Sequence, residues 1–506
     1  KIPTARHDFS YYLKNNVINS LFLSDTTAEE VSKIIDSLQT SKATGPNSVP
    51  PRLLKIASAV ISHPLSLIIN QSFSQACFPS CLKLAKVIPV FKSGVTYLCS
   101  NYRPISLLSN ISKVFEKAMH SRLYSYLEKY NLIYESQFGF RQKHSTSHAL
   151  VSMVEQIKSY LDNGKFAAGV FLDLQKAFDT VNHNILLKKL EHYGIRGHVK
   201  DWFASFLKDR KQFVTIDSTD SETKDVEYGV PQGSVLGPLL FLLYINDLRH
   251  CLTNSVARHF ADDSNILLSH SSLKMIRKSL TKDLENIFDW LCANRLSLNT
   301  KKTDLVLFKP PNKIADFRLT ISFGNTKIFL SNKVNYLGVL IDASLTWKPH
   351  LAELSKKLTK VAAILSKVRH FVPLKTLKTL YFCLFQTHLS YGCLVWGFAS
   401  KSALKRIYRI QKRTLRIITF SDFHAPTSNL FEQMQILKLD DIIELNRCLF
   451  MHDWNNSKLP YSLRSLMSLS TVHKSTRNGG TGKLHVPKTY TVKYGDRSLR
   501  FLGPNI

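Results

Sequence analysis

The first seventy residues repeat apolar positions at helical spacing. Residues 26–30 resemble a capped helix start, and apolar residues recur three and four positions apart from Val31 to Leu38. Residues 42–48 then form a predicted turn, and a second amphipathic helix follows it. We therefore expect residues 1–70 to be a helical N-terminal extension.

Two extended segments come next, at residues 87–92 and 101–106. Their apolar positions and the proline within the second segment favour strands, so the two segments predict a hairpin. Lys92 and Arg103 would then lie on neighbouring strands, where two cations can bind a triphosphate. The alternative is that both are ordinary exposed surface charges.

Residues 166–172 form a nearly continuous apolar run of strand length. Such a run predicts a central strand that is buried on both faces. The run ends at Asp173, and we expect a helix to begin at about Lys176. A carboxylate at the end of a buried strand is costly unless a partner compensates its charge, so Asp173 is a candidate site residue.

Two consecutive aspartates, Asp262 and Asp263, stand within residues 259–268 between apolar stretches. Turn-forming residues flanked by strand-forming ones predict a tight hairpin with both carboxylates at its tip. Two carboxylates about 4 Å apart repel by roughly 4 kcal/mol at an effective dielectric near 20, so a fold that keeps them together usually supplies a cation or protonates one of them. A second pair, Asp440 and Asp441, lies in an amphipathic stretch and predicts an exposed helix face.

The remaining pattern up to residue 348 predicts a mixture of helices and strands. Predicted helices cover residues 111–130, 149–161, 238–248 and 273–295, and predicted strands cover 305–308 and 334–342. Residues 180–225 are expected to be helical and then irregular.

Beyond residue 348 the pattern is helical and more basic. Residues 401–420 carry seven lysines and arginines and no acidic residue. On a helical wheel the cations share one face, opposite the apolar residues; they are Lys401, Lys405, Arg406, Arg409, Lys412, Arg413 and Arg416. A solvated face normally includes acidic residues for pairing one turn away, so their absence favours a helix that follows a nucleic-acid backbone.

Composition adds an expectation about partners. The 506-residue chain has 68 Lys and Arg against 37 Asp and Glu, which leaves a net charge of +31. An excess of this size predicts a polyanionic partner, nucleic acid before membrane, with strongly salt-dependent affinity. A merely basic soluble protein is the alternative. The length predicts two or three domains.

The eight cysteines are scattered and form no closely spaced pairs. They predict buried free thiols in a reducing, intracellular compartment, with no zinc site and no disulfide framework. The longest apolar run, residues 235–245, is too short to cross a bilayer, so no membrane partner is expected. The chain begins at Lys1 and has no visible signal peptide, and we expect it to be part of a longer polypeptide.

Asp173 and the Asp262–Asp263 pair would converge if their strands lie side by side. Three carboxylates in a basic chain fit a divalent-metal site that acts on a polyphosphate or a phosphodiester. Ligand sets made of oxygen alone select Mg²⁺ or Mn²⁺. With two such ions, one can activate an attacking hydroxyl and the other can stabilise a leaving pyrophosphate.

These residues belong to segments that resemble the motifs of a known family. Three segments look like the catalytic motifs of reverse transcriptases, in chain order: FLDLQKAFDTV at 171–181, GVPQGSVLGP at 229–238 and FADD at 260–263. Three others are similar to motifs of the non-LTR (LINE-like) retrotransposon branch: YRPIS at 102–106, QFGFR at 137–141 and YLGV at 336–339. The resemblance covers about residues 40–345, and the part that follows resembles the thumb of the same elements.

The resemblance implies an α+β right-hand polymerase with fingers, a palm that carries an antiparallel sheet, and a helical thumb. We expect fingers and palm at residues 71–345, a basic thumb at 346–450 and a loosely ordered C-terminal tail at 451–506. The implied function is that of an RNA-directed DNA polymerase, which adds dNTPs to a primer 3′-hydroxyl during retrotransposition. Its implied partners are an RNA template, a DNA primer and dNTPs.

The resemblance also implies roles for single residues. Asp173, Asp262 and Asp263 would be the catalytic groups that hold two Mg²⁺ or Mn²⁺ ions. Phe178 would be a steric gate that leaves no room for a ribose 2′-hydroxyl. The other implied nucleotide-binding residues are Lys92, Arg103, Gln232 and Gly233. The primer and template contacts expected from these motifs and from the basic helix are Gln137, Arg141, Tyr336, Gly338, Lys405, Arg409 and Lys412.

Some features depart from the family pattern or leave alternatives open. Position 47 is Asn where related elements often carry Asp, and no endonuclease, Cys/His knuckle or ribonuclease H carboxylate set is evident. One alternative is an inactive transposon relic or a domesticated nucleic-acid-binding protein. Another is an RNA-dependent RNA polymerase, a class that tends to have a polar residue at the position of Phe178.

Target-primed synthesis would place the protein in the nucleus.

Overall fold

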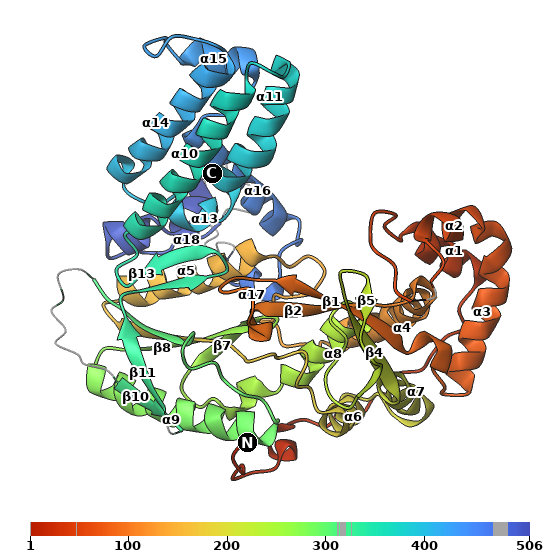
Figure 1. Ribbon diagram of the computed structural model, residues 1–506. Helices are drawn as coiled ribbons and strands as arrows, with labels where there is room; N and C mark the ends of the chain where they lie inside the picture. Colours follow the sequence, from red (N-terminus) through yellow and green to blue (C-terminus); the bar gives the residue numbers. More distant parts are fainter. Residues whose placement is uncertain are drawn as a thin grey trace, which may run out of the picture. The chain divides into compact units, whose positions relative to one another are not determined.

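The computed structural model describes residues 2–46, 48–310, 313, 320–324, 326–468 and 484–505 (Figure 1). The expectation about Asn47 and the middle of the predicted C-terminal tail lie outside the described residues. The chain forms two compact units. The first contains residues 1–140, 173–253 and 283–299, and the second contains residues 141–172, 254–282 and 300–506.

The first unit is mainly helical and carries one small sheet. Its helices are α1 (Ala28–Asp36), α2 (Pro51–Ile56), α3 (Ser58–Ser74), α4 (Asn110–Lys129), α6 (His183–His192), α7 (Gly197–Leu207) and α8 (Leu236–Ile245). Its strands are β1 (Leu84–Phe91), β2 (Tyr102–Leu107), β4 (Arg210–Ile216), β5 (Thr219–Asp220) and β6 (Lys224–Val226). Helix α9 (Leu273–Ala293) begins in the second unit and ends in the first.

The sheet of the first unit has the order β2-β1-β4-β5, with β6 paired to β4. Strands β1 and β2 form the predicted antiparallel hairpin, and β4 pairs with β1 in parallel. A cluster of aromatic rings packs the helices nearby: Trp202 stacks on Phe206 at 5.8 Å, and Phe78 meets both rings edge-on. Phe78 therefore joins two rings of α7 to a distant part of the sequence.

The second unit combines a six-stranded sheet, a separate two-stranded sheet and the C-terminal helices. Its strands are β3 (Phe166–Leu172), β7 (Val256–Phe260), β8 (Asp263–His270), β9 (Asp304–Phe308), β10 (Thr320–Phe323), β11 (Thr326–Ser331), β12 (Lys333–Tyr336) and β13 (Val339–Asp342). Its helices are α5 (Thr146–Asp162), α10 (Lys348–Val368), α11 (Leu374–Leu380), α12 (Thr387–Ser390), α13 (Cys393–Trp396), α14 (Lys401–Ile418), α15 (Ser428–Met434), α16 (Leu439–Asn455), α17 (Tyr461–Arg464) and α18 (Leu499–Leu502).

The large sheet has the order β10-β11-β9-β3-β8-β7, so β3 lies between two other strands. All seven residues of β3 are buried, as its apolar run predicted. Helix α5 packs on β3 and β7, and one hydrophobic core joins α5, the sheet and the helices that follow α10. Figure 1 shows α10, α11 and α14 side by side. The predicted α+β class is confirmed.

Two sequence expectations about secondary structure were wrong. The helix expected from Lys176 is absent; this residue has φ of 46°, the chain turns there, and α6 begins only at His183 after its cap Asn182. The segment expected to be irregular contains β4. That strand is polar, and its first residue Arg210 is buried because Glu116 from α4 compensates its charge.

The described end of the predicted tail is attached to α5. Asp162 accepts hydrogen bonds from the backbone and hydroxyl of Thr491, and Glu155 accepts one from the backbone of Leu499. Residues 484–505 are therefore more firmly held than their composition suggested. The domain boundaries expected from the resemblance do not coincide with the two compact units and stay a prediction.

Candidate active site

The Asp262–Asp263 pair lies at the tip of the β7–β8 hairpin, as predicted. Phe260 pairs with Asp263, so Ala261 and Asp262 form a two-residue turn. Ala261 has φ of 55°, a left-handed conformation that costs a non-glycine residue roughly 1–2 kcal/mol. The turn places Asp262 partly exposed and Asp263 exposed, where both carboxylates are accessible.

The strand that precedes Asp173 runs antiparallel to this hairpin within the large sheet. The register pairs Leu172, the last residue of β3, with Ser264, which directly follows Asp263. On the other side of β3, Phe171 pairs with Asp304. Burial raises the pKa of Asp304. The register therefore places Asp304, which the sequence analysis did not single out, at the same end of the sheet as the hairpin tip.

Asp173 itself belongs to the first unit, where Asn299 holds it. The Asn299 amide Nδ2 donates a hydrogen bond of 2.8 Å to Oδ2 of Asp173, and the Asn299 backbone N–H donates one to the Asp173 carbonyl. Leu174 and Leu298 form an isolated bridge beside this contact. The sequence analysis missed Asn299, because a single amide after a helix carries no signal of its own.

The segment after Asp173 packs against the glycine-containing loop at residues 228–235. The Val230 N–H donates to the Phe178 carbonyl, and Nε2 of Gln232 donates to Oδ1 of Asp179 at 2.7 Å. Burial raises the pKa of Asp179, while the Gln232 amide and Lys176 act in the opposite direction. Gln232 is thus held in the first unit by a carboxylate that the resemblance did not assign.

Gly233 brings the same loop close to β2. Its φ is 139°, and a Cβ atom there would lie 2.2 Å from the carbonyl oxygen of Ser106. The Ser106 N–H in turn donates to the Gln232 carbonyl. Only glycine fits this approach, which is why the loop needs it.

The ring of Phe178 is fixed by two other phenylalanines. It stacks on Phe241 of α8 with ring centroids 4.5 Å apart and meets Phe140 edge-on at 6.2 Å. Phe178 is only partly buried, so one side of the ring can face a ligand.

Lys92 and Arg103 lie on the β1–β2 hairpin as predicted. Arg103 pairs with Val90, and the Lys92 N–H donates to the Asn101 carbonyl just beyond the strand end. Successive side chains alternate between faces, so Lys92 and Arg103 share one face. Both side chains are exposed.

The residues expected to contact primer and template differ in exposure. Gln137 is 2% exposed and accepts a hydrogen bond from the Gly139 N–H, while Tyr336 is 3% exposed and packs on Phe171. Gly338, at the tip of the β12–β13 hairpin, is exposed and Arg141 is partly exposed. Arg141 and Gly338 are therefore accessible, whereas Gln137 and Tyr336 are buried, and the contacts expected of all four with primer and template stay predictions.

Helix α14 has the two faces that the sequence predicted. Leu404, Ile407, Leu415 and Ile418 are buried. Lys405 and Arg409 are exposed, and the ammonium group of Lys412 lies over the Tyr408 ring at 4.5 Å. No ion pair involves α14 in the part of the chain that the structure describes.

The first unit also contains a cavity of about 470 Å³ that sequence reasoning missed. It is lined by Gly233 and Ser234 of the glycine loop and by three lysines, Lys42, Lys113 and Lys117. Burial lowers the pKa of Lys113, and it lowers that of Lys117 together with the charges of Lys42 and Lys113. Lys42 comes from a predicted turn and the other two from α4, so only the fold brings them together.

The candidate catalytic side chains offer only carboxylate oxygens, with an amide beside one of them. This donor chemistry fits Mg²⁺ or Mn²⁺ and does not fit zinc. Within the described residues no group of three or more His, Cys, Asp or Glu side chains is gathered closely enough to hold a metal ion. Asp173 belongs to one unit and Asp262 and Asp263 to the other, so their convergence is a matter for the proposal below.

Two expectations from composition concern cysteines and membranes. Cys251, Cys292 and Cys393 are buried free thiols, as predicted. The other five cysteines are exposed free thiols, so the expectation of burial was wrong for them. Among the described residues, no helix combines the length and apolar character that crossing a membrane requires.

Comparison with known proteins relates the chain to one class of enzyme. Residues 90–341 match the family model described as reverse transcriptase (RNA-dependent DNA polymerase). The chain is 30% identical over 444 residues to the RNA-directed DNA polymerase from mobile element jockey of Drosophila melanogaster, covering 86% of this chain and 48% of that protein.

Two further relatives extend the comparison. The chain is 30% identical over 433 residues to the probable RNA-directed DNA polymerase from transposon X-element of Drosophila melanogaster, covering 83% of this chain and 46% of the relative. It is 25% identical over 422 residues to a Pol polyprotein from the type-1 retrotransposable element R1 of Bradysia coprophila, covering 82% and 41%. The chain thus spans about half the length of the curated relatives it matches.

Proposed function

The chain belongs to the reverse transcriptase family through its residues 90–341, and on that premise we propose that it is an RNA-directed DNA polymerase. It adds dNTPs to the 3′-hydroxyl of a DNA primer and copies an RNA template. The names of its relatives support a non-LTR retrotransposon as the setting. Retrotransposition by target-primed synthesis places this activity in the nucleus.

The observation that carries the proposal is the register between β3 and β8. Leu172 pairs with Ser264, and Asp173 is the next residue after Leu172. The carboxylates of Asp262 and Asp263 leave the chain at the adjacent turn. We therefore place Asp173, Asp262 and Asp263 around one reaction centre, with Asp263 in a supporting role.

Three carboxylates held together repel one another, and bound divalent cations offset that repulsion. Asp173, Asp262 and Asp263 would hold two Mg²⁺ or Mn²⁺ ions, and such ions would lower the pKa of the primer hydroxyl and neutralise the charge of the leaving pyrophosphate. The hydrogen bond from Asn299 restricts the orientation of the Asp173 carboxylate. Asn299 is thus a positioning residue, and positioning and charge neutralisation carry most of the catalysis in phosphoryl transfer.

The nucleotide lies over the residues of the first unit that surround Phe178. The Phe178 ring, fixed by Phe241, occupies the space that a ribose 2′-hydroxyl needs and so selects dNTPs. Gln232 and Gly233 lie below the base pair that forms. Lys92 and Arg103 bind the triphosphate, since their exposed cations share one face of the β1–β2 hairpin.

The primer and template strands contact elements of the chain that are basic and exposed. Arg141, the hairpin tip at Gly338 and the cations Lys405, Arg409 and Lys412 of α14 contact the strands directly. Gln137 and Tyr336 shape the turns beside them. In this assignment fingers and palm occupy residues 71–345, the thumb 346–450 and the tail 451–506, after an N-terminal extension.

The test is primer extension by the purified chain on poly(A) annealed to oligo(dT), with Mg²⁺ and separately with Mn²⁺. We expect incorporation of dTTP, and we expect Asp262→Asn to lower kcat on the order of 10³-fold, because it removes one anionic ligand of the ions. Template affinity should stay within a few fold, since lysines and arginines dominate it.

Asp440→Asn is the matched control, because Asp440 belongs to an exposed Asp-Asp pair in the first turn of α16. It removes the same charge and should leave kcat unchanged. No incorporation with either ion would contradict the proposal and favour an inactive relic. Equal use of UTP and dTTP would instead favour an RNA polymerase, and equal losses of binding and rate in Asp262→Asn would make this residue structural.

A further inference from the structure

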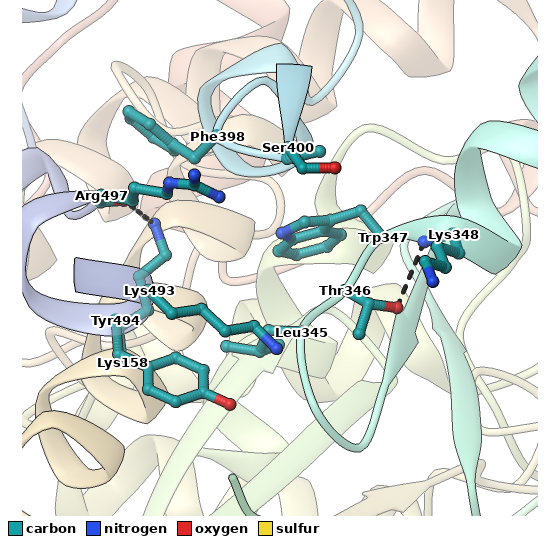
Figure 2. A pocket seen from close by; sticks show the side chains of 11 residues that line it. Lys158, Leu345, Thr346, Trp347, Lys348, Phe398, Ser400, Lys493, Tyr494 and Arg497 are labelled. Atoms are coloured by element: carbon teal, nitrogen blue, oxygen red, sulfur yellow. Dashed lines mark hydrogen bonds between the residues drawn. The ribbon is translucent and has the colours of Figure 1, made fainter. Parts of the chain in front are cut away.

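A second basic cavity lies wholly within the second unit, far along the chain from the carboxylates. It has a volume of about 240 Å³ and forms where the C-terminal segment meets the start of α10 and the residues before α14 (Figure 2). Four cations line it: Lys158, Lys348, Lys493 and Arg497. Neither the family resemblance nor the proposed chemistry uses any of them.

The C-terminal wall of the cavity is held by specific hydrogen bonds. The backbone N–H and the hydroxyl of Thr491 both donate to the Asp162 carboxylate. The Lys158 ammonium donates to the Arg497 carbonyl at 2.8 Å. Lys493 lies in the π-helical turn Val492–Asp496 between these two attachments. Lys493 and Arg497 are therefore presented from an anchored backbone.

Positive charge exceeds negative charge around this space. Lys158 is 2% exposed, and its ammonium pairs with Glu155 at 2.9 Å. Asp342, whose charge acts on Lys493, already accepts hydrogen bonds from the Thr346 backbone and hydroxyl and from the Trp347 backbone.

Lys348, Lys493 and Arg497 pair with no carboxylate in the part of the chain that the structure describes. Burial lowers the pKa of Lys493, the charges of Arg497 and Lys348 lower it further, and only Asp342 opposes them. The cavity thus gathers cations whose mutual repulsion nothing in the described structure fully offsets. A bound anion would relieve it.

The shape of the cavity also favours an anion. The long helices α10 and α14 both begin at its wall, at Lys348 and after Ser400, and helix N-termini attract negative charge. Figure 2 shows the Arg497 guanidinium extending toward the Trp347 indole, while the Lys493 side chain extends toward Leu345. Cations and an aromatic ring thus line the same cavity, and cationic side chains are the usual partners of phosphate groups.

We propose that this cavity binds a phosphate group of an RNA strand. The inference rests on the proposed function and adds to it a second contact to the template, away from the reaction centre. An RNA strand is favoured over a free phosphate compound because Ser400 lines the cavity and the acid-free basic face of α14 starts at the next residue, Lys401. A strand that follows α14 can therefore place one of its phosphates in the cavity.

The test measures binding of fluorescein-labelled single-stranded oligo(A) to the full chain by anisotropy, without dNTPs, over a range of salt concentrations. Lys493→Gln combined with Arg497→Gln should lower the slope of log K against log salt by roughly 0.7, since one phosphate contact on a single strand contributes about 0.7. The matched control is Lys458→Gln with Lys488→Gln. These exposed lysines of the same unit lie outside the cavity, so the control slope should stay close to that of the parent chain.

Three results would overturn the inference. The first is the same slope in the cavity variant and the control. The second is loss of slope in the charge-preserving variant Lys493→Arg with Arg497→Lys, which would show that packing and not charge is needed. The third is an unchanged RNA slope together with calorimetric binding of inorganic phosphate or dATP that the cavity variant abolishes, which would assign the site to a free phosphate compound.

The outcome is independent of catalysis, because the assay contains no dNTPs and can be repeated in the Asp262→Asn background. A chain that fails in primer extension but shows the cavity-dependent slope would contradict only the polymerase proposal. A chain that extends primers but lacks the slope difference would contradict only this inference.

Discussion

At the scale of single residues, Phe178 shows how packing fixes a side chain that is proposed to select dNTPs over NTPs. Its ring stacks on Phe241 from α8, and a second ring, Phe140, restrains it from the edge. A ring held on two sides cannot rotate away from a 2′-hydroxyl at low cost. The proposed steric gate therefore depends on the fold as well as on the presence of an aromatic residue.

Phe178→Ala is expected to lower discrimination between dNTPs and NTPs by roughly tenfold or more, because a pocket that loses a bulky group can no longer reject a substrate by shape. The measurement is the ratio of kcat/KM for dTTP and UTP on the same primer and template. Phe140→Ala is the comparison: it removes the edge contact and leaves Phe178 stacked on Phe241, so the ratio should fall much less than in Phe178→Ala. Unchanged selectivity in Phe178→Ala would remove the steric-gate assignment.

Asn299 is a second residue whose role becomes visible only in the structure. Its amide and its backbone both bind Asp173, although the two residues are more than a hundred positions apart. Asp179 is comparable, since it holds Gln232 through a partly buried carboxylate whose pKa burial raises. In both cases an assigned residue is oriented by a partner that no motif identifies.

At the scale of elements, α14 is an amphipathic helix whose polar face is entirely basic. Its buried residues belong to the hydrophobic core of the second unit, so the helix is fixed and its cations face solvent. Surface pairs on helices stabilise little, but cations without acidic partners are free to meet phosphates. The charges of α14 therefore add little to the stability of the fold, and they suit the proposed contact with nucleic-acid phosphates.

Arg409→Ala combined with Lys412→Ala should reduce the slope of log K against log salt for template binding by roughly 1.4 to 1.8. Fluorescence anisotropy with a labelled primer–template gives the slope. Lys274→Ala with Lys278→Ala, two exposed cations of α9, serves as the control and should leave the slope nearly unchanged. Equal effects of the two pairs would mean that α14 contributes only general charge.

Buried ion pairs connect other elements of the first unit. The Lys189 ammonium of α6 donates to Asp247 at 2.7 Å and to the Tyr244 carbonyl, and neither charged side chain is exposed to solvent. Glu116 of α4 accepts hydrogen bonds from the first N–H groups of α8 and compensates Arg210 of β4. These ion pairs explain why the charged residues are buried here, although the hydrophobic pattern of the sequence predicts charged residues on the surface.

At the scale of the whole molecule, the net charge of +31 is distributed over both units. The first unit has the lysine-lined cavity beside Gly233, and the second has α14 and the cavity at Arg497. Basic residues therefore gather at several separate places. The molecule is suited to a long polyanion that touches many of them.

Binding of any single-stranded RNA should weaken steeply with salt. If 6–10 phosphates are contacted, affinity should fall by about 10³–10⁵ between 50 and 200 mM salt. Anisotropy titrations with two RNAs of equal length and different sequence give the measurement and should yield similar curves. A fall of less than about tenfold would contradict a large electrostatic interface and favour a merely basic protein.

Much of the fold was predictable because its signal is local. The apolar run at β3, the hairpin around Asp262 and the amphipathic pattern of α14 each follow from burial and turn chemistry within ten to twenty residues. The polar strand β4 was missed because its burial depends on Glu116, about ninety positions away. The helix expected at Lys176 was wrong because tertiary contacts hold that segment in a turn.

The sequence alone therefore determined which residues can do chemistry, since motif order and the chemistry of carboxylates, cations and aromatic rings are properties of the chain itself. Only the tertiary structure decided their surroundings: Asn299 on Asp173, Phe241 under Phe178, and the lysines and arginine that gather in two cavities. The physical reason is that desolvation and charge depend on distance in space. Pairs of residues separated by tens or hundreds of positions leave no periodic trace in the sequence.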